Sequence, residues 1–418
     1  MKWIKADRDS GQLRPFKFDL RELGGALGDL GTLLPLLVAL IALNGMNPTA
    51  VLLVVGALYI VAGFYYRTPM PVQPLKVVSA IAIALGLSHR VIAAAGLWMG
   101  LILLLLAVTG AMNLIAKLFP KPVVRGIQLG LGLMLLKISF SLWSRPQIVI
   151  NGPPLFVSFA NVSFPAGIAL AAACGILLIL FLRHKWLPSS LVVLGFGTVV
   201  GILGGSLVGL TNVRLGYVPL QVGLPTREEL FAALTLLVIP QLPLTLGNAV
   251  VATADVARIY FNRTARRVTH RALLTSMGLT NIVAGLIGSV AVCHGSGGLT
   301  AHYRLGARTA GSNLMIGGLC ILIGLFLGNS ALQIISLVPY PALGALLAYV
   351  GLQHALLARD LRQAPDIAIA ALIALVTLKV GNLAIGFSSG IILYHLFRLT
   401  HHVLRITLHT ESFRRSSG

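Results

Sequence analysis

Two short polar stretches interrupt a chain that is otherwise almost entirely apolar, and their residue types are suited to binding an anion. One reads TPMPVQPLK at positions 68–76, and the other reads CHGSGG at positions 293–298. Each precedes a short segment that is expected to begin a helix. The unpaired N–H groups of a helix N-terminus, together with the helix dipole, attract negatively charged groups. The simpler alternative for the second stretch is an ordinary polar loop.

The first stretch is expected to place a lysine at the start of a half-helix inside a membrane. Pro69, Pro71 and Pro74 keep the chain extended and then favour a helix start, because proline suits the first helical turn and disfavours helix before it. Gln73 and Lys76 are then candidate contacts for an anion. The alternative for Lys76 is a side chain that extends toward the membrane surface.

The second stretch offers bare backbone to a ligand. Gly295, Gly297 and Gly298 expose N–H groups that an anion can approach without a side chain in the way. Ser296 adds a hydroxyl group at the same place. His294 could donate to an anion or titrate in a coupling step. A single histidine in an apolar chain is also commonly structural, and both interpretations stay open.

A third polar set lies in the segment IPQLPLTLGNAVVATAD at positions 239–255. Gln241, Thr245, Asn248 and Thr253 recur every three to five residues, so they share one face of a helix. The first three could hydrogen-bond the oxygens of an anion. The alternative is that they link neighbouring helices, as polar side chains commonly do in membrane bundles.

One acidic residue lies within the predicted membrane region. Asp29 occurs in GDLGTLLP at positions 28–35, and Thr32 of the same stretch is a candidate for a supporting role at the site. Asp29 could couple transport to a proton or cation, or it could pair with Lys76. Because helix starts also favour aspartate, a structural role at a helix start is the alternative.

The elements that must position these residues are membrane helices. The 418-residue chain is 57% hydrophobic and only 10% charged, with a mean hydropathy of +0.91. Many apolar runs reach the roughly 20 residues that cross a bilayer. We predict an all-α polytopic membrane protein with the spans 23–43, 49–66, 74–88, 91–116, 122–140, 163–182, 188–210, 229–252, 269–290, 297–305, 309–328, 332–357, 365–380 and 384–402.

These fourteen segments fall into two sets of seven. The third segment of each set, 74–88 and 297–305, is short and interrupted, which is typical of transporters whose substrate site lies between inverted repeats. An odd number of spans gives the two repeats opposite orientations. The predicted organisation is an N-terminal segment 1–22, a first repeat 23–212, an inverted second repeat 228–403 and a tail 404–418.

A weak internal match supports the repeat. The fifth segment opens with FPKPVVRG and the twelfth with VPYPALGA, and one constant offset superposes the prolines and a later glycine of the two segments. The superposed pairs are Pro120 with Pro339, Pro122 with Pro341, and Gly132 with Gly351.

The charge distribution sets the orientation. The chain has 32 Lys and Arg residues against 11 Asp and Glu residues, a formal net charge of +21. With the N-terminus in the cytoplasm, most basic residues fall on the cytoplasmic side, as the positive-inside rule requires. The basic cluster 258–271 then faces anionic lipid. We therefore expect both termini in the cytoplasm and no nucleic-acid partner.

Motifs for catalysis are missing from the sequence. It contains no P-loop, no GxSxG serine motif and no HExxH pair. Cys174, Cys293 and Cys320 form no CxxC pair. We expect a protein that is not an enzyme and that has no cofactor or metal site.

Three stretches closely resemble the signature segments of the molybdate transporter family, whose members are related to the sulfate permeases. They are GDLGTLLP (28–35), PMPVQPLK (69–76) and CHGSGGLTAHYRLGART (293–309). The resemblance implies a high-affinity oxyanion importer with a fold similar to that of uracil permease. Segments 1–4 and 8–11 would form a core domain and segments 5–7 and 12–14 a gate domain. Whether the protein forms a homodimer stays open.

Two functions follow as hypotheses. The first is a secondary active transporter that imports molybdate, with sulfate and tungstate as further candidates, by alternating access, with the anion bound between two half-helix N-termini. The alternative is a nucleobase or organic-anion:cation symporter of the same fold. That alternative needs an acidic or amide side chain in the eighth segment to bind ring nitrogens, and Gln241 is the candidate.

Overall fold

The structure is a computed structural model that describes most of the chain. The described residues are 16–28, 30–112, 120–149, 154–159, 162–182, 189–204, 206, 213–380, 385–386 and 388–396. Asp29, residues 1–15 of the N-terminal segment and the tail 404–418 lie outside this set. Thr32 lies in a described helix, but the description does not extend to its side chain.

Helices dominate the described residues of the first half of the chain. They are α1 (Leu20–Gly28), α2 (Leu30–Asn44), α3 (Pro48–Tyr66), α4 (Lys76–Leu85), α5 (His89–Thr109), α7 (Lys121–Trp143), α8 (Ala166–Phe181) and α9 (Ser189–Leu203). The strands of this half are β1 (Gln73–Pro74), β2 (Phe156–Phe159) and β3 (Val162–Pro165), and the last two pair as a hairpin.

The second half begins with one continuous helical run. Its parts are α10 (Arg227–Ala232), the π-helix η2 (Ala233–Val238), α11 (Ile239–Leu244), the π-helix η3 (Thr245–Ala252), α12 (Thr253–Phe261) and the 3₁₀ helix η4 (Asn262–Arg267). The elements that follow are α13 (His270–Leu286), β4 (Val292–Cys293), α14 (Ser296–Leu305), α15 (Gly311–Leu327), η5 (Gly328–Ser330), α16 (Ala331–Ser336), α17 (Tyr340–Leu356), η6 (Leu357–Asp360) and α18 (Ala364–Val380).

Local signals explain where several helices begin and end. Asn47, Ser88 and Thr269 each precede a helix and accept a hydrogen bond from an N–H of its first turn. Gly86 and Gly110 end α4 and α5 in the left-handed conformation, with φ of 60° and 68°. These caps fix the ends of helices whose apolar surfaces alone would not define them.

The described part of the chain contains six helical runs that are long and apolar enough to cross a membrane. They are Pro48–Tyr66, His89–Thr109, Lys121–Trp143, Arg227–Arg267, Gly311–Ser330 and Tyr340–Asp360. The prediction of an α-helical, multi-pass membrane protein is thereby supported. The full count of fourteen segments in two inverted repeats stays a prediction.

Three helix pairs meet at facing glycines. A Cβ on Gly56 of α3 would lie 2.7 Å from the carbonyl oxygen of Gly317 on α15, and one on Gly100 of α5 would lie 2.8 Å from the carbonyl oxygen of Gly278 on α13. Small residues let membrane helices approach this closely. The third pair joins α7 and α17, where a Cβ on Gly132 would lie 2.5 Å from the carbonyl oxygen of Gly351.

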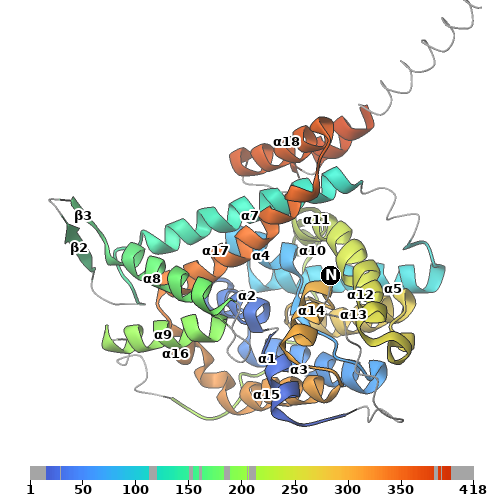
Figure 1. The fold of residues 1–418 in the computed structure, drawn as a ribbon, viewed down its shortest axis with the longest axis horizontal. Coiled ribbons are helices and arrows are strands. Elements are labelled where there is room, and N and C mark those ends of the chain that lie inside the picture. The colour runs from blue at the N-terminus through green and yellow to red at the C-terminus, as the bar shows by residue number, and fades with distance from the viewer. Residues whose placement is uncertain are drawn as a thin grey trace, which may run out of the picture.

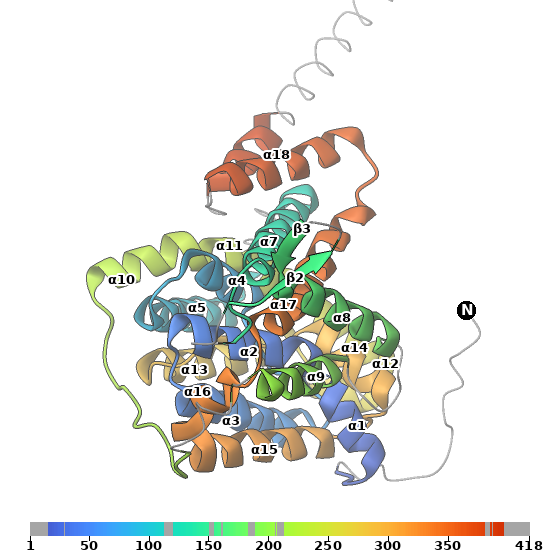
Figure 2. The same cartoon turned by 90° about the vertical axis from the view of Figure 1, so that its left-hand side faces the viewer.

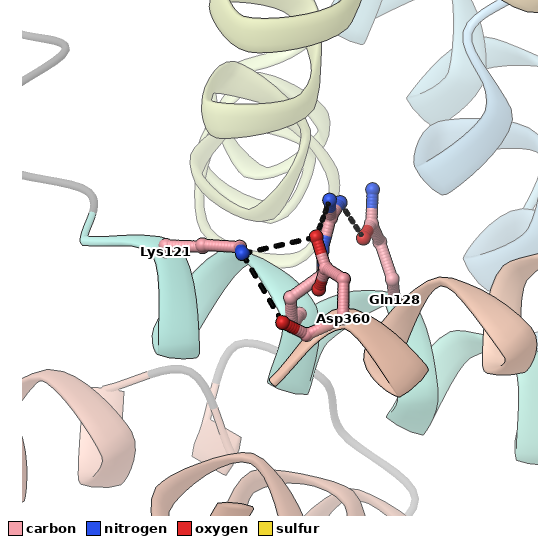
Figure 3. Close-up of polar contacts among 4 residues, drawn as sticks. Lys121, Gln128 and Asp360 are labelled. Atoms are coloured by element: carbon pink, nitrogen blue, oxygen red, sulfur yellow. Dashed lines mark hydrogen bonds and ion pairs between the residues drawn. The ribbon is translucent and has the colours of Figure 1, made fainter. Parts of the chain in front are cut away.

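Ion pairs join α7 to the end of α17 beyond this glycine contact. The guanidinium group of Arg125 donates to both carboxylate oxygens of Asp360 at 2.8 and 2.7 Å, and the Lys121 ammonium lies 3.1 Å from the same carboxylate. Arg125 also donates to Gln128 at 2.9 Å (Figure 3). The α7–α17 pair is therefore connected both along its length and at one end.

Helix α7 packs against α17, α18 and α4. In Figures 1 and 2, α18 lies on one side of α7 and α4 on the other. Residues of α8, α9 and α17 form a small hydrophobic cluster of their own, whereas a much larger cluster joins α2, α3, α4, α5 and α13 to residues of α7, α17 and α18. The β2–β3 hairpin projects at the edge of the molecule beside α8.

The two short helices are joined through their preceding strands. β1 and β4 pair in antiparallel orientation, with Gln73 opposite Cys293 and Pro74 opposite Val292, and all four residues are buried. The N–H of Leu75 also donates to the carbonyl oxygen of Ala291 at 2.9 Å. Short helices were predicted at 74–88 and 297–305, and α4 and α14 are observed there.

Candidate functional site

Two buried asparagines hold the crossing strands in place. Asn281 of α13 donates to the carbonyl oxygen of Val292 at 3.0 Å and accepts from the Val292 N–H at 2.7 Å. Asn313 of α15 makes the same pair of bonds with Met70, at 2.7 and 2.8 Å. Strands of two residues have few ladder bonds, so these amides satisfy backbone groups that would otherwise be unpaired. Sequence reasoning missed both asparagines.

Gln241 connects the polar face of the eighth predicted segment to the start of α4. Its Oε1 accepts from the N–H groups of Val77 and Val78 at 2.8 and 3.2 Å. Its Nε2 donates to the Thr245 hydroxyl at 2.9 Å. Gln241 therefore occupies two of the first N–H groups of α4, and Thr245 supports it.

The helix that carries Gln241 is locally widened. The π-helical segments η2 and η3 flank α11, which contains Pro240 and Pro243. Proline has no N–H to donate and displaces the preceding turn, so the regular hydrogen-bond ladder is interrupted here. Such π-helical turns are frequent at functional sites. The run brings Gln241 to α4 and Asn248 to α14.

The start of α14 is bare and partly open. Gly295 is the N-cap residue of α14 and has no side chain that could accept from the first N–H groups of the helix. Ser296 donates its hydroxyl proton to Asn248 Oδ1 at 2.5 Å. A Cβ on Gly295 would lie 3.0 Å from Gln73 Oε1, whereas a Cβ on Gly297 would meet no atom within 4 Å. Gly297 is exposed, and open space therefore adjoins it.

His294 is fully buried and both of its ring nitrogens contact protein groups. Nδ1 lies 2.8 Å from the Pro71 carbonyl oxygen, so this nitrogen carries a proton and donates. Nε2 lies 3.1 Å from the Ser276 hydroxyl, which is 2.8 Å from the Tyr66 hydroxyl. His294 thus links the two crossing stretches through Pro71 and is positioned beside the site.

The far end of α14 is attached to the N-terminal helix. Glu22 of α1 accepts from the N–H groups of Arg308 and Thr309, both at 2.9 Å. Its other carboxylate oxygen is buried and has no hydrogen-bond partner among the described residues. Burial raises the pKa of Glu22 above its ordinary value, and the hydrogen bonds from Arg308 and Thr309 oppose this shift. Sequence reasoning had assigned Glu22 only to the N-terminal segment.

The structure brings most of the predicted site residues together. The contacts above join Gln73, Gly295, Asn248 and Ser296 in one group and Gln241, Thr245 and the start of α4 in another. Lys76 is the first residue of α4 and is partly buried. Gly298 is buried in the first turn of α14. Pro69 and Pro71 lie in the segment that leads into β1, and Pro74 lies within it.

This chemistry suits recognition of an anion. Backbone N–H groups, an amide, hydroxyl groups and a lysine surround the start of two helices. Among the residues that the structure describes, no group of three or more His, Cys, Asp or Glu side chains could hold a metal ion. Asp29, the coupling candidate, lies outside those residues.

Comparison with protein families shows the family to which the chain is related. The family described as "Molybdate transporter of MFS superfamily" matches residues 21–135 and 233–353, which include both short helices and the Gln241 segment. The chain belongs to this molybdate transporter family. The "Molybdate transporter 2" of Arabidopsis thaliana is 29% identical over 94% of this chain and 90% of its own length. A "Probable sulfate transporter" of Mycobacterium tuberculosis is 29% identical, over 62% of this chain and 46% of its own length.

A solved structure shows the fold of this molybdate transporter family member. The transmembrane domain of a cyanobacterium bicarbonate transporter, BicA, superposes with a TM-score of 0.63 at 18% sequence identity, covering 88% of this chain and 96% of that domain. The chain is thus an integral, multi-pass membrane protein with the fold of an anion transporter.

Proposed function

We propose that this protein is a secondary active transporter that imports molybdate by alternating access, with sulfate and tungstate as further substrates. The anion would bind at the start of α14, close to the start of α4. Its contacts would be the N–H groups of Gly297 and Gly298 and the Lys76 ammonium group, while the Ser296 hydroxyl, which donates to Asn248, would hold the first turn of α14 in place. Gln73, Asn248 and Gly295 would shape the site around them.

The observation that carries this proposal is the antiparallel pairing of β1 with β4. That pairing places the N-terminal ends of α4 and α14 next to one another in the interior of a membrane protein. The open space at Gly297 lies at one of these ends. Helix N-termini bind anions through unpaired N–H groups and the helix dipole, and a transporter with broken helices uses them in this way. The molybdate and sulfate transporter relatives agree with an oxyanion substrate.

The contacts of Gln241, Thr245 and His294 favour supporting roles in this site. Gln241 already accepts from Val77 and Val78 and donates to Thr245. A nucleobase symporter would need this amide to bind the ring of its substrate, so these contacts speak against that alternative. His294 would position the second stretch through Pro71.

Several features support an inverted repeat. Helices α3, α5, α13 and α15 correspond to predicted segments 2, 4, 9 and 11. A two-fold axis that relates segment 2 to segment 9 and segment 4 to segment 11 would exchange the pair α3–α15 with the pair α5–α13. Both pairs meet at glycines. Pro120 and Pro339 have nearly equal backbone angles before α7 and α17, with φ of −64° and −62° and ψ of 151° and 147°. Gly132 and Gly351, which the sequence superposes, contact one another.

The predicted core and gate domains also belong to this proposal. The separate hydrophobic cluster of α8, α9 and α17 is what a gate domain would contain. The α7–α17 pair would then face the core through α4 and would move relative to it. The cytoplasmic position of both termini, the lipid contact of 258–271 and a homodimer remain parts of the proposal.

Uptake of labelled molybdate into proteoliposomes tests the proposed function. We expect saturable uptake that unlabelled tungstate and sulfate reduce and that uracil leaves unchanged. Empty liposomes of the same lipid are the control for leakage. Absence of saturable oxyanion uptake would refute the proposal, and competition by uracil alone would favour the nucleobase symporter.

A further inference from the structure

A cavity of about 300 Å³ lies where the end of α5 meets the start of α13. These two helices pack side by side in antiparallel directions (Figures 1 and 2). The α5 wall is largely apolar and includes Leu106, Val108 and Met112, whereas α13 contributes His270 and Arg271. None of the residues proposed to bind the transported anion lines this cavity, so it is a separate place on the molecule.

An exposed apolar ridge on α5 leads to the cavity. Leu101, Leu105 and Val108 are 55%, 60% and 78% exposed, and their spacing places them on one face of the helix. On a helix that is long and apolar enough to cross a membrane, such a face is covered by lipid. Helix α5 ends at Thr109 and Gly110, and both residues line the cavity. The cavity therefore lies where a lipid-facing surface gives way to polar residues.

The α13 side of the cavity carries positive charge that no carboxylate offsets. Arg271 is exposed in the first turn of α13, and Arg263, Arg266 and Arg267 lie in η4 directly before that helix. The range 258–274 contains no Asp or Glu. Within the described residues, no carboxylate forms an ion pair with these four arginines. This surface therefore attracts a negatively charged partner.

His270 supplies a polar atom that has nothing to bond to in the protein as described. It is the first residue of α13, it lines the cavity, and its Nε2 is buried with no hydrogen-bond partner among the described residues. Leaving a buried polar atom unpaired is costly. The tautomer with a proton on Nε2 can donate to a phosphate oxygen, and the neighbouring Arg271 can add a charge-assisted hydrogen bond. The two side chains together suit a phosphate group.

We propose that this cavity binds an anionic phospholipid of the cytoplasmic leaflet, with its phosphate on His270 and Arg271 and an acyl chain along the ridge of α5. Basic pockets between membrane helices on the cytoplasmic side hold anionic headgroups in this way. The apolar ridge favours a lipid over free phosphate, because free phosphate has no chain to cover it. The inference rests on one part of the proposed function, the lipid contact of 258–271, and gives that contact a defined site.

The opposite end of the same helix pair provides a matched control. There His89 and Arg90 begin α5 and line a smaller cavity of about 110 Å³. Pro225 lines this cavity too, and the carboxylates of Glu228 and Glu229 follow closely in the first turn of α10. The same pair of residue types thus lies near negative charge. We expect no preference for anionic lipid at this end.

Native mass spectrometry of the purified full-length protein in detergent tests the proposal. The probes are phosphatidylglycerol and phosphatidylcholine with the same acyl chains. The wild-type protein should bind phosphatidylglycerol about tenfold more tightly, because a hydrogen bond to a charged group is worth about this factor. The double variant His270→Gln/Arg271→Gln should lose this preference, whereas His89→Gln/Arg90→Gln should keep it. Thermal unfolding in the same detergent shows whether each variant folds.

Glycerol 3-phosphate, which has the phosphate without acyl chains, distinguishes a lipid site from a site for free phosphate. We expect it to bind at least about tenfold more weakly than phosphatidylglycerol, since the burial of apolar chains is missing. Equal binding of the two would overturn the proposal. So would a wild-type protein without a preference for phosphatidylglycerol, or a preference that the His270/Arg271 variant keeps or that the His89/Arg90 variant loses.

A second variant covers the case in which the double variant does not fold. Arg271→Gln alters an exposed side chain, so it should fold, and its preference for phosphatidylglycerol then decides. The outcome is independent of transport. Loss of the lipid site with intact molybdate uptake would overturn this inference alone, and phosphatidylglycerol binding without saturable oxyanion uptake would overturn the proposed transport alone.

Discussion

Replacement of Gly297 is the sharpest test of the anion site, because the structure leaves open space at this residue. A Cβ at Gly297 would meet no atom within 4 Å, so a side chain there does not collide with the fold. Gly297 lies in the first turn of α14, and replacing a helical glycine by alanine stabilises a helix by up to about 1 kcal/mol. We expect Gly297→Ala and Gly297→Leu to fold as the wild-type protein does.

Molybdate binding, unlike the stability of the fold, should weaken in these variants. A side chain at Gly297 occupies the space through which an anion reaches the N–H groups of Gly297 and Gly298. A hydrogen bond to a charged group contributes about 1.5 to 3 kcal/mol, which corresponds to about ten- to one-hundredfold in affinity. We expect Gly297→Ala to weaken molybdate binding by about tenfold. Gly297→Leu should weaken it by about one hundredfold or more.

A matched control separates this effect from a general response to larger side chains. Gly318 lies within α15, and a Cβ there also meets no atom within 4 Å. Gly318→Leu should therefore leave the affinity unchanged. Calorimetric titration with molybdate and thermal unfolding in the same detergent give both quantities. Wild-type affinity in a folded Gly297→Leu protein would show that the anion does not bind at the start of α14.

Three further predictions concern residues around the site. Gln241→Glu keeps an acceptor for the N–H groups of α4 but adds a negative charge. The variant should fold, and calorimetry should show that molybdate binding is weaker by at least about tenfold. Unchanged binding would place the anion elsewhere. Asn281→Ala leaves the buried N–H and carbonyl groups of Val292 unpaired and should lower stability by about 2 to 5 kcal/mol in denaturant unfolding, and a loss below about 0.5 kcal/mol would contradict this role. Glu22→Gln should be at least as stable as wild type at neutral pH, because burial raises the pKa of Glu22 and the ionised form is costly in the folded state. Thermal unfolding should show that this stability advantage of Glu22→Gln shrinks as the pH falls through the raised pKa, because Glu22 of the folded wild-type protein then becomes protonated. An advantage that does not change with pH would refute the assignment.

Much of the arrangement of the candidate site could be predicted, because polar residues are rare in this chain and are therefore informative. Ser296 and Asn248 were both candidates, and the structure joins them by a hydrogen bond. The prolines of the first stretch correctly indicated an extended segment that leads into a short helix. Gln241 was also predicted to lie at the site, although its bonds to α4 could not be foreseen from one helical face.

Other parts of the candidate site have no local signal in the sequence. Strands of two residues show no alternation of polar and apolar side chains, so the pairing of β1 with β4 could not be found by periodicity. Asn281 and Asn313 each lie in an apolar helix, and their roles depend on backbone groups of another element. Such residues depend on tertiary packing alone.

The close contact of Gly132 with Gly351 limits how this transporter can move. Two backbones separated by no side chain cannot part or slide without losing that contact, and Asp360 fixes the same two helices at one end. Under the proposed alternating access, α7 and α17 would therefore move together. The proposed movement would then occur between these two helices and α4. A rigid covalent cross-link from α7 to α17 should therefore leave uptake intact, whereas one from α4 to α17 should stop it.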